Sequence, residues 1–323
     1  MLHTFFRATA CALAVLAGLP AAAQDWPSKP VRVVVPFPPG GSVDPLARLV
    51  SARLSVTLKQ QFVVENRPGA GGSIGTALAA KAPADGYTFL FVFDSHGVNQ
   101  ALIANLPYDT AKDFAPVMLV GTAPYVIATQ ADKPWKTFTE VVAASKAKPD
   151  SVSIGSIGNG TLGHLVLVQA QQMAGIKITH APFAGGGPMN QNILGGQIDM
   201  GVGSLALLAP QVRGGKMKAI AVASDKRVSL MPEVPTLIEQ GFPGLTAYAW
   251  WGIYAPTGTP KPILDRFHAE LVKVLNLPDV RNTLAEGLGM DLVISSPEEL
   301  QKWTLEQMAR WGKVVKDNTI KTD

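Results

Sequence analysis

The sequence predicts an α/β fold organised as two domains. Apolar runs of strand length alternate with segments of helical periodicity along most of the chain, beginning with VRVVVPF at residues 31–37. Strands that are separated by helices favour mainly parallel sheets covered on both faces. Two apolar stretches, 116–129 and 246–256, are too long for ordinary strands. We expect both stretches to cross from one sheet to another.

Residues 1–23 have the pattern of a secretory signal peptide. Arg7 precedes the apolar run ATACALAVLAGL, and AAA at 21–23 supplies an A-x-A cleavage site. The run is too short to span a membrane, and the alternative interpretation is a buried N-terminal helix. We therefore expect a cleaved signal and a periplasmic mature protein. The only cysteine, Cys11, lies inside this segment, so we expect no disulfide in the mature chain.

The mature chain opens with the strand at 31–37 and a helix behind it. We place Asp44 at the N-cap of this helix and Pro45 at its first position, because Leu46 and later apolar residues recur at helical spacing. Further strands are expected, in order, at 62–66, 87–93, 152–156, 177–183, 198–204 and 218–224.

The two crossing stretches set the domain boundaries. If both cross, residues 123–249 form an inserted second domain, and the first domain is built from 24–122 plus 250–323. The closing helix fits the first domain, and Ser296-Pro297-Glu298-Glu299 forms its capping box. Its apolar stripe is made by Leu300, Trp303, Met308, Trp311 and Val315.

Composition and charge argue against several classes of function. The chain is 47% hydrophobic and 16% charged, which suits a well-covered α/β protein. Removing Arg7 with the signal leaves 27 basic against 24 acidic residues, scattered without the basic run of a nucleic-acid face. No later segment has the apolar length of a membrane span. No histidine pairs with another His or Cys at ligand spacing, so we predict neither a metal site nor a cofactor.

Glycine-rich loops are the feature that points to a ligand. PFPPGGS, GSIGNGT and FAGGGP each follow a predicted strand, at the edge where open α/β sheets bind ligands. Small side chains let backbone N–H groups approach an anion, and a helix N-terminus adds partial positive charge. These loops contain no Lys or Arg. We predict that they form a carboxylate cradle of backbone amides and hydroxyls, split between the two domains.

Two short motifs have a catalytic interpretation. GNGTLG at 158–163 matches G-x-G-x-x-G, but the next strand ends at His180, where a dinucleotide site needs an acid. GGSIG at 71–75 matches the nucleophile elbow, but RPGA separates Ser73 from the preceding strand. An exported hydrolase that uses Ser73 or Ser204 with a histidine stays open as the alternative.

Several long motifs carry a family resemblance over essentially the whole mature chain. In order they are WPSKPVRVVVPFPPGGSVDPLAR, VVENRPGAGGSIGT, APADGYTFLF, LPYDTAKDFAPV, GSIGNGTLGHL, PEVPTLIEQGFPGL and WWGIYAPTGTPKPI. The chain resembles the Bug family, the extracytoplasmic solute receptors associated with tripartite tricarboxylate transporters.

The resemblance implies a fold, a ligand class and partners. The fold is the α/β type II periplasmic-binding-protein fold, with two α/β lobes joined by crossing strands. The ligand is a small carboxylate captured between the lobes, and the partners are the membrane permease subunits of a tripartite tricarboxylate-type transporter. We expect a monomer with no nucleic-acid partner and no catalytic activity. A membrane sensor is the alternative client.

The resemblance also implies ligand-binding residues, position by position. The first-lobe loop would supply Phe37, Pro38, Pro39, Gly40, Gly41 and Ser42. The second-lobe loops would supply Ser156, Gly158, Asn159, Gly160 and Thr161, with Phe183, Ala184 and Gly185 closing the side. Ser95, His96, His164 and Ser204 complete the prediction, although either histidine could instead be a structural hydrogen-bonding residue.

Asp94 departs from the family pattern. The stretch FVFDSHGVN stands where family members usually carry a Thr/Ser-rich segment. A carboxylate near the pocket would repel an anionic ligand unless it is paired. In one interpretation Asp94 binds a donor on the ligand, as in an amino acid, a carboxamide or a protonated pyridine carboxylate. In the other, it caps the following turn through Ser95 or His96.

Overall fold

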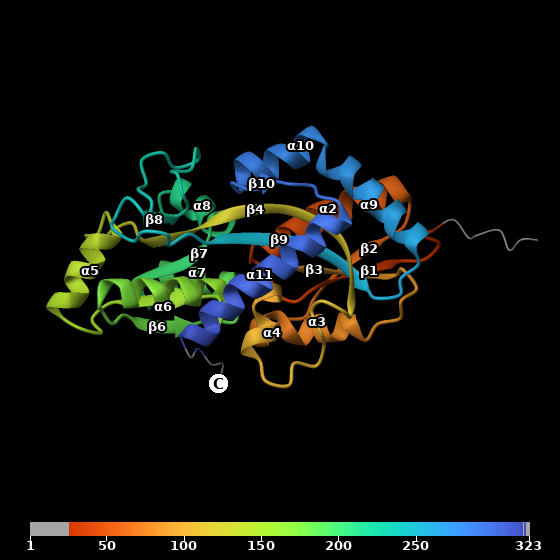
Figure 1. The fold of residues 1–323 in the computed structure, drawn as a ribbon. Helices are drawn as coiled ribbons and strands as arrows, with labels where there is room; N and C mark the ends of the chain where they lie inside the picture. The colour runs from red at the N-terminus through yellow and green to blue at the C-terminus, as the bar shows by residue number, and fades with distance from the viewer. Residues whose placement is uncertain (1–25, 319, 321–323) are drawn as a thin grey trace, which may run out of the picture.

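The computed structural model of the chain describes residues 26–318 and 320. The predicted signal peptide at 1–23 and Cys11 lie outside these residues. Within the described part of the chain, no helix combines the length and apolar content needed to cross a bilayer. The strands run along the long axis of the molecule, and helices lie above and below them in the view of Figure 1.

The strands form one mixed sheet. The described residues give ten strands, with the order β2-β1-β3-β9-β4-β7-β5-β6, and β8 and β10 also pair with β4. Their bounds are β1 Val31–Val35, β2 Phe62–Asn66, β3 Thr88–Val92, β4 Phe114–Gln130, β5 Ser153–Ser156, β6 Thr179–Pro182, β7 Met200–Ser204, β8 Met217–Ala223, β9 Tyr248–Pro256 and β10 Asp291–Leu292. Each strand expected from the sequence is present, and β10 is additional. The expectation that 116–129 and 246–256 cross between two separate sheets is wrong, because β4 and β9 are neighbours within this one sheet.

The long strand β4 belongs to both ends of the sheet. From Phe114 to Pro124 it pairs with β9, and from Tyr125 onward it pairs with β7 and β8. We call the side of β1, β2, β3, β9 and β10 the first lobe and the side of β5 to β8 the second lobe. In Figure 1, β4 and β9 run side by side through the middle of the molecule.

The prediction of mainly parallel sheets is wrong for the centre of the sheet. The outer pairs β1–β2, β1–β3, β5–β6 and β5–β7 are parallel, as helical connections between strands require. Every pair that includes β4 or β9 is antiparallel. The reason is that β4 runs out of the first lobe and β9 runs back into it, so the two strands pair in opposite directions.

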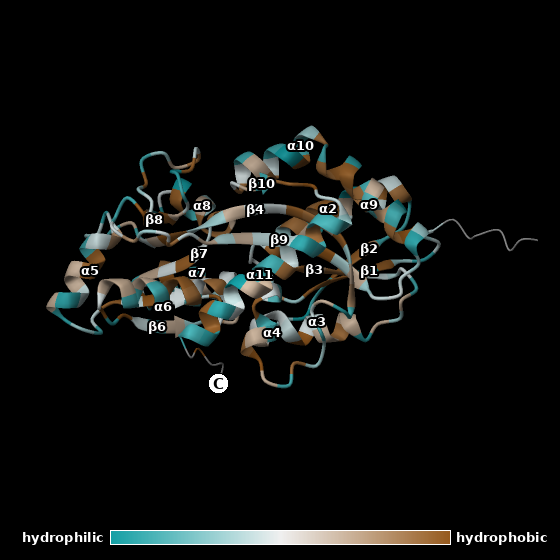
Figure 2. Ribbon diagram, viewed as in Figure 1, coloured by the Kyte–Doolittle hydropathy of each residue, from teal (hydrophilic) through white to brown (hydrophobic). Residues whose placement is uncertain are grey.

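Helices pack against both faces of the sheet, which buries the strands. β1 and β3 are almost entirely apolar and are hydrophobic in Figure 2, with Val33 and Phe89 fully buried. The helices are α2 Val43–Leu58, α3 Ser73–Ala80, α4 Asn99–Leu102, α5 Phe138–Ala147, α6 Leu162–Ala174, α7 Gly186–Leu194, α8 Leu205–Arg213, α9 Lys261–Leu275, α10 Pro278–Arg281 and α11 Pro297–Asp317. Short 3-10 helices lie at Ala70–Gly72 (η2) and Asp94–Gly97 (η3), and a π-helical segment lies at Asn282–Gly287 (η4).

Two helix starts test the capping predictions. The prediction for α2 is wrong by two positions, because Ser42 is the N-cap and Asp44 lies in the first turn. The Asp44 carboxylate instead accepts hydrogen bonds from Arg48 and Asn66, which ties α2 to β2. The capping box of α11 is confirmed, with Ser296 and Glu299 bonding each other's backbone amides.

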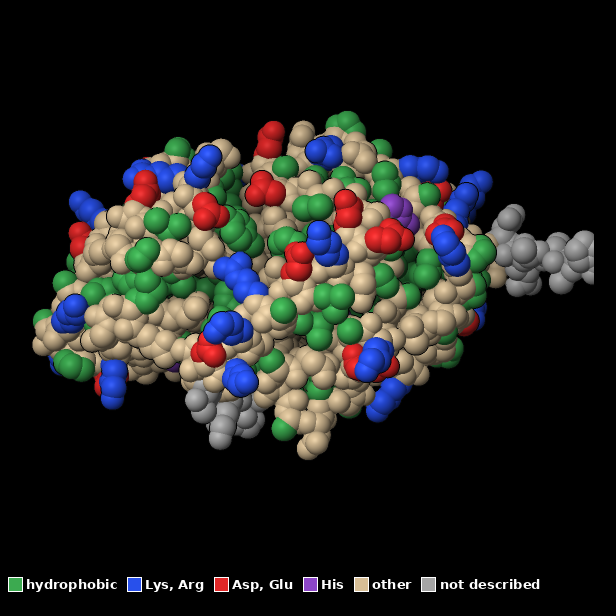
Figure 3. All heavy atoms as spheres, viewed as in Figure 1, with side chains coloured by type: hydrophobic (Ala, Val, Ile, Leu, Met, Phe, Trp, Pro, Cys, Tyr) green, Lys and Arg blue, Asp and Glu red, His purple; other side chains and the backbone are tan. Residues whose placement is uncertain are grey.

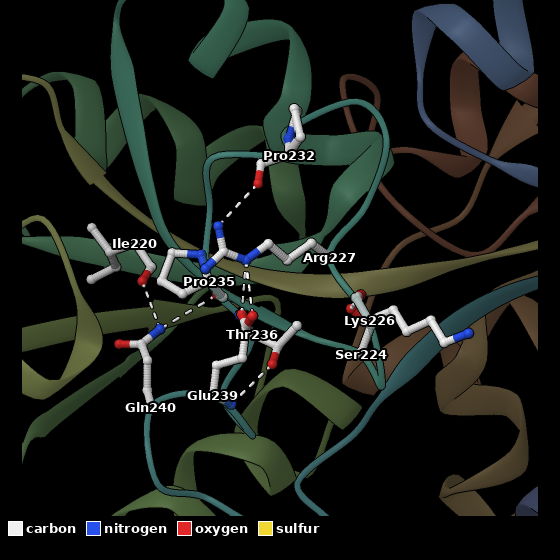
Figure 4. A network of polar contacts seen from close by, with 9 residues as sticks. All are labelled: Ile220, Ser224, Lys226, Arg227, Pro232, Pro235, Thr236, Glu239 and Gln240. Carbon is white, nitrogen blue, oxygen red and sulfur yellow. Dashed lines mark hydrogen bonds and ion pairs between the residues drawn. The ribbon is translucent and has the colours of Figure 1, made fainter.

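The segment between β8 and β9 is held by polar contacts instead of a regular element. Figure 4 shows Arg227 bonding the Glu239 carboxylate and the Pro232 carbonyl, which holds residues 227–239 of this segment together. Gln240 Nε2 donates to the Ile220 carbonyl of β8. Elsewhere on the surface, Figure 3 shows Lys and Arg lying among Asp and Glu on the face in view.

Candidate ligand-binding site

A cavity of about 280 Å³ lies between the two lobes. It is lined from both sides by loops that follow the carboxyl ends of strands. The first lobe contributes Pro36, Phe37, Gly69, Ala70, Gly71, Gly72, Asn99 and Ile103, and the second lobe contributes Ile157, Gly158, Asn159, Phe183 and Ala184. Most of the first group follow β1 and β2, and the second group follow β5 and β6. The edge predicted for a ligand is therefore the edge that carries this cavity.

The two lobes meet directly beside the cavity. A Cβ atom added to Gly185 would lie 2.6 Å from Pro38 Cγ, and one added to Gly187 would lie 2.8 Å from the Pro39 carbonyl oxygen. The predicted loop residues Pro38, Pro39 and Gly40 therefore contact 185–187 instead of lining the cavity. This contact closes one side of the site.

A smaller space of about 20 Å³ adjoins this contact and shares Phe37 and Ile157 with the main cavity. Among the predicted residues, Gly41, Ser42 and Ser204 line it. The Ser204 side chain is buried, and its hydroxyl has no hydrogen-bond partner among the described residues.

The cavity wall is neutral. None of its lining residues carries a charge, and its polar side chains are Asn99 and Asn159. Asn99 Nδ2 donates to the Gly71 carbonyl at 3.2 Å, so this side chain supports the loop at 69–72. The remaining polar groups at the wall are those of the backbone. An anion in this cavity would be held by neutral donors, as the absence of Lys and Arg from the loops predicts.

The loop at 156–161 is fixed by its own side chains. The Thr161 hydroxyl donates to the Gly158 carbonyl at 2.7 Å, and the Gly158 amide donates to Ser156 Oγ at 3.3 Å. His164 Nδ1 accepts from the Gly160 amide at 2.9 Å. Of the predicted residues in this region, Gly158 and Asn159 line the cavity, whereas Ser156, Gly160, Thr161 and His164 hold the loop behind them.

Asp94, Ser95 and His96 lie behind the cavity and do not line it. The Asp94 carboxyl is buried and accepts a hydrogen bond of 2.7 Å from the Tyr125 hydroxyl. Ser95 Oγ donates to the Gly71 carbonyl at 2.7 Å, so it supports the cavity wall from outside. Of the two partners expected for a capping Asp94 side chain, the Ser95 backbone also bonds the carboxyl, whereas both ring nitrogens of His96 are unpaired among the described residues.

Burial controls the ionisation of these groups. Loss of solvent raises the pKa of Asp94 to about 8, against the smaller opposing effects of hydrogen bonds from Tyr125 and the Ser95 backbone. His96 packs against the rings of Phe114 and Tyr254, and burial lowers its pKa to about 3. Both His96 nitrogens lack a hydrogen-bond partner among the described residues. The prediction that His96 contacts the ligand is therefore not supported by its position.

Several cavity residues were missed at the sequence level. Gly69 to Gly72 are not among the predicted ligand-binding residues, but they form one wall of the cavity. The run RPGAGG after a strand is the signal that could have identified them, because it has the same character as the loop after β1. Asn99, Ile103 and Ile157 had no comparable signal.

The hydrolase alternative lacks its activated nucleophile. Among the described residues, no hydrogen bond joins Ser73 or Ser204 to a histidine, and Ser204 Oγ and both nitrogens of His96 are unpaired. The described residues also contain no cluster of three or more metal-ligating side chains.

Comparison with known proteins identifies the family of this chain and supports a solute-binding site between two lobes. A model of the tripartite tricarboxylate transporter family receptor matches residues 46–320. The solved periplasmic binding protein BugD is 32% identical, with a TM-score of 0.87 over 92% of this chain and 100% of that one. Rpa4515 of R. palustris, solved with adipate, is 31% identical, with a TM-score of 0.87 over 92% of this chain and 99% of that one. MatC of Rhodopseudomonas palustris, solved with malate, is 33% identical, with a TM-score of 0.84 over 90% and 100%.

These similarities extend over at least 90% of this chain and at least 99% of each relative's chain. The two-lobe α/β fold expected from the sequence is confirmed by them. The relatives are receptors that bind solutes, which also excludes the hydrolase alternative. The chain therefore belongs to the tripartite tricarboxylate transporter receptor family, whose Bug members it resembles in sequence and structure, and it is a periplasmic solute-binding receptor and not an enzyme.

Proposed function

We propose that this receptor captures a small carboxylate in the cavity between its lobes. The observation that carries the proposal is the neutral, glycine-rich wall to which both lobes contribute. Backbone amides that are exposed at such loops bind carboxylate oxygens without the desolvation cost of a buried cation. Relatives with about one-third sequence identity were solved with adipate and with malate, which are both dicarboxylates.

The most suitable ligand class is a dicarboxylate with an apolar middle. Phe37 and Ile103 from the first lobe and Ile157 and Phe183 from the second provide apolar surface in the cavity. A cavity of about 280 Å³ is at the lower end of small-molecule sites, so it favours short ligands. Each lobe would bind one of the two carboxylates through its backbone amides, and the carbon chain between them would contact the apolar side chains.

The lobes are assigned as 24–122 plus 250–323 and as 123–249. The change of β4 partners between Pro124 and Tyr125, and the start of β9 at Tyr248, support these boundaries. The two strands would form the hinge, and a ligand that contacts both lobes would favour the closed arrangement.

The receptor would deliver its ligand to the membrane permease subunits of a tripartite tricarboxylate-type transporter. Family membership supports this client, and the sequence pattern at 1–23 supports export with a cleaved signal. We assign the monomer as the working form, because one chain supplies both walls of the cavity.

A thermal-shift screen tests the proposed ligand class. The mature protein would be mixed with mono-, di- and tricarboxylates, amino acids and pyridine carboxylates, and hits would be measured by calorimetry. Adipate, malate or another dicarboxylate should raise the melting temperature, because a ligand that binds only the native state stabilises it by mass action. A screen in which no carboxylate shifts the melting temperature would overturn the proposal.

A further inference from the structure

Two histidines from different elements stack behind the loop at 156–160. His164 lies in the first turn of α6 and His180 lies in β6, and their ring centroids are 4.2 Å apart with an interplanar angle of 4°. Both side chains are partly buried. The stack therefore joins α6, which follows the loop, to β6, which pairs with the strand β5 that precedes the loop.

Each imidazole bonds one end of the loop. His164 Nδ1 accepts from the Gly160 amide at 2.9 Å, and His180 Nε2 lies 2.7 Å from Ser156 Oγ. Ser156 Oγ lies in turn 3.0 Å from the Gly158 carbonyl oxygen. Gly158 and Asn159, between these two anchors, are the loop residues that line the cavity.

The loop needs such anchors because its own backbone is permissive. Gly158 has φ +139° and Gly160 has φ +70°, conformations that glycine adopts freely and also leaves freely. The Gly160 amide donates to His164, and the Gly158 amide donates to Ser156, so these bonds act at the two glycines. A loop of this kind is pre-organised for a ligand only if side chains outside it restrict its conformations.

We propose that His164 and His180 are a stacked pair of positioning residues that holds the 156–160 loop in its ligand-binding conformation. The inference rests on the proposed function, in which this loop receives part of the carboxylate. Neither histidine needs to touch the ligand. Their role requires the neutral imidazole, because Nδ1 of a protonated His164 carries a proton and cannot accept the Gly160 hydrogen bond.

The surroundings of the pair favour the neutral form. Burial lowers the pKa of His164, and burial together with the nearby His164 lowers the pKa of His180 to about 4. Burial alone lowers the pKa of His164, and His164 is the only ionisable side chain among the causes that lower the pKa of His180. Acidification through this range would place two positive charges in the stack and release Gly160, which loosens the loop.

The first test uses the ligand-free protein, so it does not depend on the identity of the ligand. Backbone NMR would follow the Gly160 amide from pH 7 to pH 4, with the His164 ring signals as reference. We expect the Gly160 amide shift to change with the same midpoint as the His164 ring. In His164→Asn, whose side-chain oxygen replaces Nδ1 as acceptor, the amide should stay constant. A Gly160 amide that ignores the ionisation of His164 would overturn the proposal.

The second test uses adipate and malate binding by calorimetry. His164→Ala and His180→Ala should each weaken binding by about tenfold, the scale of one lost hydrogen bond in a pre-organised site. The conservative variants His164→Asn and His180→Gln should stay within about threefold of wild type at pH 7, since each keeps a polar atom at the bonding position. Conservative variants as weak as the alanine variants would show that the rings act by packing and not by anchoring the loop.

Acidification separates positioning from a general structural role. The affinity of wild type divided by that of the double variant His164→Asn/His180→Gln should fall as pH drops from 7 to 4.5, because only wild type loses the bond to Gly160 on protonation. Using one ligand for both proteins cancels its own ionisation. A ratio that stays constant would contradict the proposal. If no carboxylate binds even the wild-type protein, the proposed function fails, and the Gly160 amide measurement still decides the role of the pair.

Discussion

The Tyr125 hydroxyl donates a hydrogen bond of 2.7 Å to Asp94 Oδ2, and this bond connects the end of β3 with the point where β4 changes partners. Both side chains are buried, and Asp94 Oδ1 has no partner among the described residues. Because burial raises the pKa of Asp94 to about 8, the carboxyl is protonated over most of the neutral range. The buried contact between Asp94 and β4 therefore contains a neutral acid instead of a carboxylate that would repel an anionic ligand.

The first prediction concerns the pH dependence of stability. The pKa of Asp94 is raised from 3.8 to about 8 by folding, so the native state holds a proton that the unfolded state releases in this range. The contribution of protonated Asp94 to the free energy of unfolding is fully present below pH 3.8 and is lost as pH rises to about 8. Asp94→Asn keeps the shape and removes the titration. The variant should gain stability relative to wild type between pH 5 and pH 8, by up to about 1.4 kcal/mol per pH unit.

Urea denaturation at several pH values between 5 and 9 measures this difference. The comparison between variant and wild type removes the contributions of all other titrating groups that the two proteins share. Parallel stability curves for the two proteins would show that Asp94 ionises in the native state as it does in the unfolded chain.

The second prediction concerns the hydrogen bond itself. Tyr125→Phe removes the only side chain that bonds Asp94 among the described residues and should cost about 1–3 kcal/mol in the free energy of unfolding. Tyr87→Phe is the matched control, because the Tyr87 hydroxyl bonds Ser28 at an exposed site. We expect the control to lose much less stability. Equal losses in the free energy of unfolding would show that the buried bond to Asp94 stabilises the protein no more than the exposed bond to Ser28 does.

Ligand ranking decides between the two interpretations of Asp94. Since Asp94 does not line the cavity, Asp94→Asn should leave the order of affinities for dicarboxylates, amino acids and pyridine carboxylates unchanged. The calorimetric series from the ligand screen gives this order for both proteins. A selective loss of ligands that carry an N–H donor would instead support direct contact with Asp94.

The third prediction concerns closure of the lobes. Gly187 lies in the first turn of α7, and an added Cβ would meet only first-lobe backbone, at 2.8 Å from the Pro39 carbonyl oxygen. Gly187→Ala should therefore improve the helix slightly but keep the lobes apart, weakening ligand binding by at least about tenfold. Gly312→Ala in α11 is the control, because its added Cβ meets only Ala101 at 3.6 Å.

Small-angle X-ray scattering with and without ligand measures closure, and calorimetry measures affinity. The Gly187 variant should stay more extended in the presence of ligand than wild type does. An unchanged affinity in this variant would show that the contact between Pro39 and Gly187 is not needed for binding.

The parts of this protein that local sequence pattern determines were predictable. The apolar run at 31–35 gave β1, and the Ser296 capping box gave the start of α11. The direction of the central strands was not predictable from local pattern, because the pairing of Thr122 with Trp250 joins segments far apart in the sequence. The same reason applies at the site. The glycine loops were visible as motifs, but the bond from Tyr125 to Asp94 depends on how the lobes pack.

The last prediction tests whether the cavity receives a negatively charged group at the 156–160 loop. Asn159 lines the cavity, and no lining residue is charged. Asn159→Asp keeps the size of the side chain and adds a negative charge, so it should weaken adipate or malate binding by about tenfold or more at pH 7. Added salt should reduce the loss, since a partly exposed charge is screened.

The control for this change is Asn282→Asp, which adds the same charge at an exposed position outside the cavity lining. Calorimetry at low and high salt would compare both variants with wild type. The control should bind like wild type at each salt concentration. If Asn159→Asp also binds like wild type, the carboxylates lie too far from the 156–160 loop to feel its charge, and the loop would form a wall of the cavity without holding the anion.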